Sequence, residues 1–242
     1  MMVHWKEGPL FPSLVPGEVH IWFADLYQLN NRIKYEWLSS DERVRAAKYH
    51  FVQDRMRFIT ARGILRMLLS RYLMLKPKDV HFSYGLFGKP YLVHATLNLP
   101  LTFNLSHSNT SVLLAISLYQ EIGIDIQSIR NHPAILLALR SCLAESERVA
   151  LLQIPINEQV TYLYRYWVCK EAFMKTTGWG FQIPPYKIIV DLENISQPKL
   201  WFGNPRITKS KYWYLSLLNI DMSHAALCVE GPIDACCFWT LK

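Results

Sequence analysis

The stretch WVCKEAFMK, residues Trp167–Lys175, lies in a helical pattern that begins near Glu158 and ends at Gly178. Apolar residues recur along one face at helical spacing: Val160, Leu163, Tyr164, Trp167 and Val168. Glu171 and Lys175 continue that face over the next two turns. A buried charge is costly unless it is paired, so this face predicts partners for both side chains. The alternative is an exposed pair, since Glu followed four residues later by Lys stabilises a helix surface.

Length and composition favour one large domain or two smaller ones with a sizeable core. The chain has 242 residues, of which 51% are hydrophobic, so disorder is not expected. The formal net charge of +7 predicts an anionic partner: a nucleic acid, a phosphorylated small molecule or an acidic protein. Because the basic residues are scattered rather than clustered in a tract, a nucleic-acid-binding tail is disfavoured.

Cysteine usage and the N-terminal segment bear on the compartment and on metal binding. The cysteines are Cys142, Cys169, Cys228, Cys236 and Cys237. None forms a C-x-x-C pair, so zinc is not expected, and their odd number is typical of reduced thiols. Met1–His20 has no apolar stretch typical of a signal peptide, and the longest apolar runs have only the length of strands. We therefore expect a cytoplasmic protein that does not associate with membranes.

The first half of the chain predicts strands arranged around one long helix. Strands are expected at 19–24, 80–84, 101–105 and 112–117. Ser39 or Ser40 caps a helix with an acidic first turn, and the long helix runs from Asp54 to about Leu75 before Pro77. The polar segment Asn104–Thr110, between two apolar strands, is typical of a turn.

The second half repeats this pattern approximately. Helices are expected at 133–143, 145–152 and 158–177, and strands at 123–127, 186–192, 199–202, 212–218 and 225–229. A Ser-His pair next to an apolar strand occurs in each half, at Ser106-His107 and Ser223-His224. We expect an α+β fold in which two similar lobes, each a small sheet packed with a long helix, are related by a pseudo-twofold axis. Residues 1–118 would form the N-terminal lobe and 119–242 the C-terminal lobe, with the active site between them.

Several residues could carry chemistry, and each has a structural alternative. Asp125 and Glu171 are oxygen ligands of the kind that Mg²⁺ takes together with substrate phosphates, although Asp125 could also lie on a solvated strand face. Lys89, in a glycine-containing turn, and His107 could contact phosphates. Arg62 flanks the apolar face of the first long helix, where it either snorkels or binds phosphate. A substrate with phosphoryl groups fits this set best.

The motifs together resemble the 4'-phosphopantetheinyl transferases of the Sfp type, the two-lobed, single-chain class. The resemblance spans roughly residues 19–230 and rests on Gly88-Lys89-Pro90, Asn104-Leu105-Ser106-His107-Ser108, Gly123-Ile124-Asp125-Ile126 and Trp167–Lys175, in the family's order. It implies transfer of the phosphopantetheine arm of coenzyme A to a serine of an apo acyl or peptidyl carrier protein, with release of adenosine 3',5'-bisphosphate. The carrier could serve fatty-acid, polyketide, nonribosomal-peptide or lysine pathways.

The resemblance also implies roles for individual residues. Asp125, Gln127 and Glu171 would form the Mg²⁺ site, and Glu171 or Lys175 would take the proton of the incoming serine. Many family members have Glu where this chain has Gln127, which predicts weaker metal binding. The coenzyme A contacts would be Arg45, Arg62, Lys89, Pro90, Ser106, His107, Lys170 and Lys175, of which His107 and Arg45 match positions near the 3'-phosphate.

The expected partners are therefore coenzyme A and a carrier protein, and the expected state is a monomer. The N-terminal lobe would bind coenzyme A, and the C-terminal lobe would carry the metal and the catalytic helix. Two alternatives stay open: a coenzyme A-binding protein without transfer activity, and a basic nucleic-acid-binding module, for which no recognition motif is present.

Overall fold

The computed structural model describes residues 4–93, 100–195, 197–202 and 212–242. The helices are α1 (Leu26–Leu29), α2 (Ser40–Ala47), α3 (Val52–Leu73), α4 (Pro133–Ser141), α5 (Glu145–Leu152) and α6 (Gln159–Thr177). The strands are β1 (Lys6–Glu7), β2 (Glu18–Asp25), β3 (Phe82–Tyr84), β4 (Pro90–Leu92), β5 (Leu101–Ser108), β6 (Ser111–Leu118), β7 (Ile122–Ser128), β8 (Ile188–Asp191), β9 (Lys199–Phe202), β10 (Trp213–Ile220), β11 (Ser223–Glu230) and β12 (Ala235–Thr240).

Two lobes repeat one arrangement, which confirms the predicted duplicated α+β fold. In the first lobe β2, β6 and β5 lie side by side, and in the second β7, β11 and β10 do so in the same chain order. Each lobe inserts a long helix, α3 or α6, and a short hairpin, β3–β4 or β8–β9, between its first strand and the other two. The two Ser-His pairs are not equivalent, because Ser106-His107 lies near the end of β5 whereas Ser223-His224 begins β11, the counterpart of β6.

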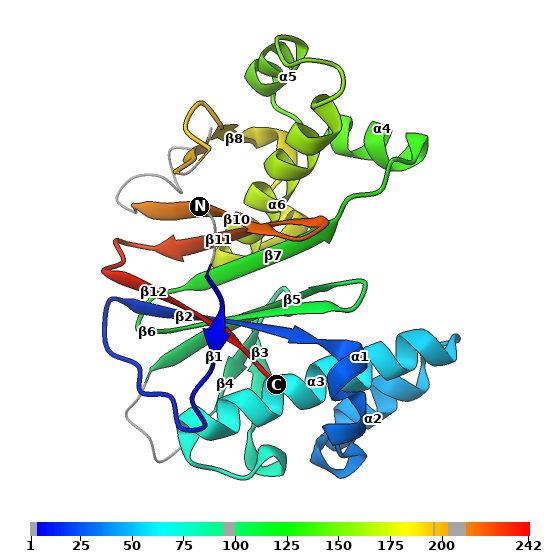
Figure 1. Cartoon of the computed structure of the whole chain (residues 1–242), viewed down its shortest axis with the longest axis vertical. Coiled ribbons are helices and arrows are strands. Elements are labelled where there is room, and N and C mark those ends of the chain that lie inside the picture. Colours follow the sequence, from blue (N-terminus) through cyan, green and yellow to red (C-terminus); the bar gives the residue numbers. More distant parts are fainter. Residues whose placement is uncertain (1–3, 94–99, 196, 203–211) are drawn as a thin grey trace.

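The molecule is built in four layers, with the two sheets face to face and one long helix on each outer side (Figure 1). Between the sheets lies a core of aliphatic side chains that includes Val19, Ile21, Leu113, Ala115, Ile124, Ile126, Ala225 and Leu227. The alternating residues of the same strands point the other way, toward α3 in the first lobe and α6 in the second. This alternation turns Asp125, which lies between Ile124 and Ile126, toward α6.

The edge strands β5 and β7 meet through side chains rather than through a backbone ladder. Polar side chains of β5 accept hydrogen bonds from backbone N–H groups of β7 that no neighbouring strand pairs. The pairs are Asn104 Oδ1 with Ile124 N (3.0 Å), Ser106 Oγ with Ile126 N (3.3 Å) and Ser108 Oγ with Ser128 N (2.9 Å). This side-chain ladder fixes the register between the lobes, since both members of each pair advance by two residues.

The ladder explains why the expected turn at Asn104–Thr110 is wrong. Strand β5 continues through Ser108, and the turn consists of Asn109, with a φ of 53°, and Thr110. The polar residues are typical of a turn by composition, but here every second one bonds to the free edge of another strand. Their spacing of two residues is the period of a strand.

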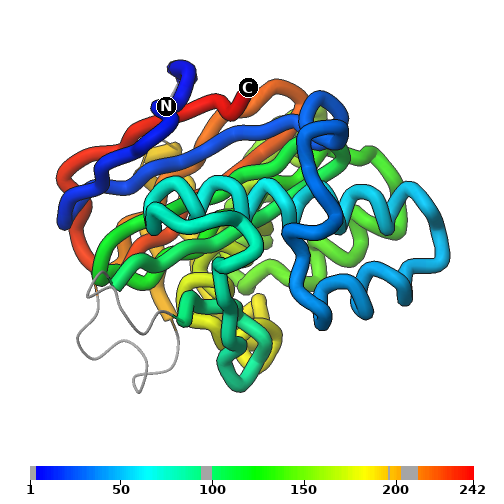
Figure 2. The backbone as a smooth tube through the Cα atoms, turned by 90° about the horizontal axis from the view of Figure 1, so that it is seen from below, coloured from blue at the N-terminus to red at the C-terminus, as the bar shows by residue number. Residues whose placement is uncertain are grey.

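The last strand corrects the expected lobe boundary. Strand β12 pairs in parallel with β2, from Ala235 opposite Glu18 to Thr240 opposite Phe23, and therefore belongs to the sheet of the first lobe. Figure 2 shows this C-terminal segment in red beside β2 in blue. Residues 119–242 thus do not all belong to the second lobe, because the chain crosses back at its end. In the part of the chain that the structure describes, no helix has the length and apolar character to cross a membrane.

The ends of the long helices follow local signals in the sequence. Ser39, one of the two serines that the sequence predicts as the cap, is the N-cap residue of α2, and its backbone N–H donates to Glu42 Oε2 at 3.0 Å. Helix α6 ends where Gly178 adopts a left-handed conformation, with a φ of 70°, and donates its N–H to the Met174 carbonyl. This cap places the last turn of α6, which carries Lys175, directly over β7.

Close packing between α6 and β7 depends on Gly123. A Cβ atom at this position would overlap the carbonyl oxygen of Ala172 and the backbone nitrogen of Thr176. Backbone atoms in a packed helix cannot move aside cheaply, so a side chain here would push α6 away from the sheet.

We predict that Gly123→Ala lowers the free energy of unfolding by about 1–3 kcal/mol, the range expected for overpacking a filled core. Urea denaturation followed by circular dichroism measures the change. Gly85→Ala is the matched control, because a Cβ there meets only the Lys89 carbonyl oxygen at 3.6 Å. Equal stability of the two variants would contradict the proposed contact.

Candidate active site

Three polar side chains from three elements meet where the lobes join. Asp125 of β7 is 1% exposed, and its Oδ1 lies 2.6 Å from Lys175 Nζ of α6. Ser106 of β5 donates to the same oxygen at 2.9 Å and accepts from Lys175 Nζ at 2.9 Å. Lys175 also donates to the Ile124 carbonyl at 3.2 Å, so all three of its N–H groups are used. The first lobe thereby supplies the hydroxyl that completes a charge pair of the second.

Glu171 lies one helical turn before Lys175 and is in an unusual electrostatic position. Burial and the negative charge of Asp125 raise its pKa to about 7, although Lys175 acts in the opposite direction. Lys175 forms its ion pair with Asp125, and among the described residues no cation pairs directly with Glu171. The exposed Glu-Lys couple that the helix pattern allowed is therefore not what forms. Two carboxylates that repel one another at a partly open site are suited to a divalent cation.

Gln127 lies on the same face of β7 as Asp125, two residues further along. Its amide nitrogen is 3.4 Å from Asp125 Oδ2 and donates to it. The oxygens of Asp125, Gln127 and Glu171 are the candidate ligands for a hard cation here, and only two of these three side chains carry charge.

A cavity of about 260 Å³ adjoins Glu171 and Lys175. Its lining comes from both lobes: Phe87, Gly88, Lys89, Pro90, Asn104 and Leu105 from the first, and Glu171, Met174, Lys175, Gly178, Gly180 and Phe181 from the second. The cavity thus lies beside the expected catalytic helix, against the turn that carries Lys89 and Pro90.

Lys89 is held by the second lobe. Its Nζ donates to the Thr176 carbonyl at 2.8 Å, to the Ile122 carbonyl at 3.3 Å and to Glu121 Oε2 at 2.5 Å. The ammonium group therefore fastens the β3–β4 hairpin to the end of α6, while the rest of the residue lines the cavity. A direct phosphate contact would require it to leave these three acceptors.

His107 follows Ser106 on β5 but points to the surface, as expected from strand alternation. Neighbouring protein atoms displace water from around the ring, which lowers the pKa of His107. The positive charges of Lys175 and Arg57 lower this pKa further. Arg57 of α3 is a basic residue near this site that the sequence interpretation did not single out. Its place on the exposed side of α3 opposite a histidine could not be read from helix periodicity alone.

The two arginines expected to bind coenzyme A have different environments. Arg45 of α2 is exposed and lies over the Phe58 ring, 5.4 Å from its centroid. Arg62 donates its Nε to Glu42 at 2.6 Å, and Glu42 is 2% exposed and also binds Arg66. Burial acts to raise the pKa of Glu42, but the two arginines outweigh it and hold that pKa below its usual value. Arg62 is thus engaged inside the first lobe, and the structure does not bring it to the cavity.

Lys170 is placed outside the site, which corrects the expectation that it contacts coenzyme A. Its side chain is fully buried, and its Nζ lies 2.6 Å from Glu147 Oε2 and 2.9 Å from the carbonyl oxygens of Cys142 and Pro185. One residue along a helix turns the side chain by about 100°, so Lys170 faces α5 while Glu171 faces the other lobe. Its role is to join α6 to the helices beside it.

Comparisons with known proteins place the chain in a family. A family model described as the 4'-phosphopantetheinyl transferase superfamily matches residues 121–229, and one described as 4'-phosphopantetheinyl transferase, N-terminal, matches residues 28–118. The chain is 36% identical over 235 residues to the 4'-phosphopantetheinyl transferase HetI of Nostoc sp., covering 96% of each protein. The chain belongs to the 4'-phosphopantetheinyl transferase family. It is thus a transferase that moves the 4'-phosphopantetheine group of coenzyme A to carrier proteins.

Other proteins similar to this chain are more distant. The transferase Sfp of Bacillus subtilis is 31% identical over 209 residues, which cover 86% of this chain and 88% of that protein. A solved structure of a holo-(acyl-carrier-protein) synthase from Bacillus anthracis, in complex with CoA (3',5'-ADP), is 21% identical with a TM-score of 0.40. The matched region covers 46% of this chain and 96% of the synthase chain.

The raised pKa of Glu171 predicts how the stability of the metal-free transferase depends on pH. An unfolded chain loses this proton near the ordinary value of 4.5, whereas the folded chain keeps it until about pH 7. Between these values the folded state binds more protons, so its stability falls as the pH rises. Glu171→Gln removes this titrating group. Between pH 4 and pH 8 we therefore expect the free energy of unfolding of the variant to rise by up to about 3 kcal/mol relative to that of the wild type.

Urea denaturation in the presence of a chelator, repeated across this pH range, measures the difference. Glu145→Gln is the matched control, since Glu145 is an exposed carboxylate on α5 with a side chain 85% exposed. A stability difference between Glu171→Gln and the wild type that stays constant with pH would contradict the raised pKa.

Proposed function

We propose that the transferase is magnesium-dependent and that Asp125 and Glu171 hold the ion at the contact between the lobes. The observation that supports this most directly is the pair of mutually repelling carboxylates, of which Glu171 lines a cavity formed by both lobes. Their oxygens are the hard donors that Mg²⁺ prefers, and the cation would relieve their repulsion. When bound, it would neutralise charge on the pyrophosphate of coenzyme A during phosphoryl-type displacement.

Lys175 is proposed to position the reacting groups. Its ammonium already binds Asp125 and Ser106, so it is held at the cavity by both lobes. A fixed positive charge at this place stabilises the negative charge that develops on a leaving phosphate, since it needs no reorganisation during the reaction.

The incoming serine of the carrier protein must lose its hydroxyl proton as its oxygen attacks phosphorus. Glu171 is the proposed acceptor, directly or through water, because it lines the cavity. Lys175, one helical turn away, donates its three ammonium protons to Ser106, Ile124 and Asp125, so its proposed role is to stabilise charge rather than to accept the proton. The bond from the pyrophosphate bridging oxygen to the transferred phosphorus breaks, and adenosine 3',5'-bisphosphate leaves with that oxygen.

Recognition of the nucleotide is assigned to the first lobe. His107, with Arg57 nearby and Arg45 on the exposed side of α2, is proposed to attract the 3'-phosphate. The segment Lys89–Pro90 would lie along the adenine and ribose with its backbone and aliphatic atoms, since the Lys89 ammonium is bound to the second lobe. The net charge of +7 favours both coenzyme A and acidic carrier proteins.

Incubation with an apo carrier protein, coenzyme A and Mg²⁺, followed by mass spectrometry of the carrier, tests the proposal. We expect a mass gain equal to phosphopantetheine and a rate about 10²–10⁴-fold lower for Glu171→Ala, the range for loss of a catalytic acid or base. Glu145→Ala should react like the wild type.

The remaining candidate is a protein that binds coenzyme A without transferring it. Tight coenzyme A binding, with no mass gain on acyl and peptidyl carriers alike, would favour that candidate and overturn the proposed site chemistry. A mass gain that persists with chelator in place of Mg²⁺ would instead overturn the magnesium assignment alone.

Gln127 offers a second test of the metal site. Gln127→Glu places a third carboxylate beside Asp125, and we expect the Mg²⁺ concentration for half-maximal activity to fall about tenfold, equivalent to about 1.4 kcal/mol. Mg²⁺ titrations of transfer activity measure it, with Gln153→Glu at the exposed end of α5 as the control for added charge. Identical titrations for the wild type and both variants would place Gln127 away from the metal.

A further inference from the structure

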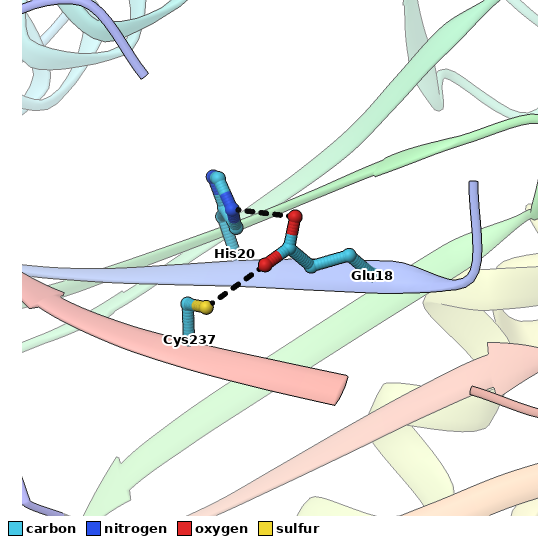
Figure 3. A group of neighbouring side chains, drawn as sticks. All are labelled: Glu18, His20 and Cys237. Carbon is cyan, nitrogen blue, oxygen red and sulfur yellow. Dashed lines mark hydrogen bonds and ion pairs between the residues drawn. The ribbon is translucent and has the colours of Figure 1, made fainter. Parts of the chain in front are cut away.

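A second group of potential metal ligands lies in the first lobe, between neighbouring strands. Glu18 and His20 project from β2 and Cys237 from the adjacent β12 (Figure 3). One ligand atom from each residue lies within 4.8 Å of the others. We propose that these three side chains bind a zinc ion that fastens the C-terminal strand to the first lobe.

The spacing of the ligand atoms suits a small tetrahedral ion. His20 Nε2 is 3.3 Å from Glu18 Oε2, and Cys237 Sγ is 3.1 Å from Glu18 Oε1. Ligands of a tetrahedral zinc ion, at bond lengths of about 2.0–2.3 Å, lie roughly 3.3–3.8 Å from one another. The two contacts use different oxygens of Glu18, and one ligand atom from each residue lies within 4.8 Å of the others, so the carboxylate must turn and the side chains must move together by about 1 Å to surround the ion.

The ligand types select zinc over magnesium. One thiolate, one imidazole and one carboxylate form a mixed soft and borderline set, and thiolates are poor ligands for hard cations. With the thiol and the carboxyl both ionised, their two negative charges balance the charge of Zn²⁺. The side chain of Glu18 is 20% exposed, which gives solvent, and so a water molecule as the fourth ligand, access to this group.

Second-layer hydrogen bonds orient the histidine for this role. His20 Nδ1 is 2.7 Å from the Tyr72 hydroxyl of α3, which accepts a bond from Trp22 Nε1 at 2.7 Å. The Tyr72 contact occupies Nδ1, so Nε2 is the nitrogen directed at Glu18. Zinc-binding histidines are commonly held through their other nitrogen in this way.

Metal binding requires a defined exchange of protons. Without metal the Cys237 thiol donates to Glu18, and burial raises the pKa of that thiol to about 11. Burial likewise lowers the pKa of His20, so its imidazole is neutral. On binding, Cys237 releases its proton to solvent, and the remaining imidazole proton occupies Nδ1 and faces the Tyr72 oxygen.

The site is separate from the proposed active site and joins distant parts of the chain. His20 lies on the α3 side of the first sheet, whereas Asp125 lies on the α6 side of the second, with both sheets between them. Glu18 and Cys237 are 219 residues apart in sequence. An ion bound to both would cross-link β2 and β12 and resist separation of the last strand.

Cobalt(II), which replaces zinc and absorbs when bound to thiolate, tests the proposal. When Co²⁺ is added to the chelator-treated protein, we expect a thiolate-to-cobalt charge-transfer band in the absorption spectrum. Addition of Zn²⁺ should remove this band, and Cys237→Ala should not develop it. Cys236→Ala is the matched control, because the neighbouring Cys236 packs into the core between the sheets. A band that is absent from the wild type, or unchanged in Cys237→Ala, would overturn the site.

Thermal unfolding gives an independent readout. At zinc concentrations about 100-fold above its dissociation constant, the melting temperature should rise by about 5 °C or more in the wild type and Cys236→Ala. Cys237→Ala and Glu18→Gln should show little or no rise. An equal rise in all four proteins would mean that zinc binds elsewhere and would overturn the assignment.

Discussion

The structure depends on three hydrogen bonds from side chains of β5 to backbone amides of β7. A free strand edge exposes N–H groups whose burial without partners costs about 1–3 kcal/mol each. Asn104, Ser106 and Ser108 satisfy three of them, at the seam where the sheets of the two lobes meet. A slip of one residue would turn all three side chains to the opposite face, so the ladder excludes a one-residue shift between the lobes.

The middle member of this ladder also organises the chemistry. Ser106 Oγ accepts from the Ile126 amide and Lys175 and donates to Asp125, so structural and catalytic groups share one hydroxyl. A buried ion pair is stable only when its remaining hydrogen-bonding capacity is satisfied, and Ser106 does this for the pair of Asp125 and Lys175. Glu171, for which the described part of the chain provides no such hydrogen bond, keeps the raised pKa that favours a cation beside it.

The ends of the helices and the orientation of the strand residues follow local sequence signals and are predictable. Features that depend on contacts between distant parts of the chain are not. The capping residue Ser39, the terminator Gly178 and the alternation around Asp125 each act over a few residues, so the sequence placed their elements correctly. The polar composition of the Asn104–Thr110 segment fits either a turn or an edge strand whose side chains bond to another strand. Only the position of β7 distinguishes the two. Lys170 was misassigned because neither its ion pair with Glu147 nor its bonds to Cys142 and Pro185 leave a signature in sequence spacing.

The two lobes have similar folds but place different polar groups beside their first strands. In each lobe the first strand presents two polar residues, two positions apart, to its long helix: Glu18 and His20 on β2, Asp125 and Gln127 on β7. The outer edge of β2 is covered by the backbone of β12, which brings the thiol of Cys237 beside this pair. The outer edge of β7 is covered by side chains of β5, which bring a hydroxyl and leave space for the cavity. The element that covers each edge therefore decides which groups join the polar pair, and only the second lobe's pair opens toward a cavity that both lobes line.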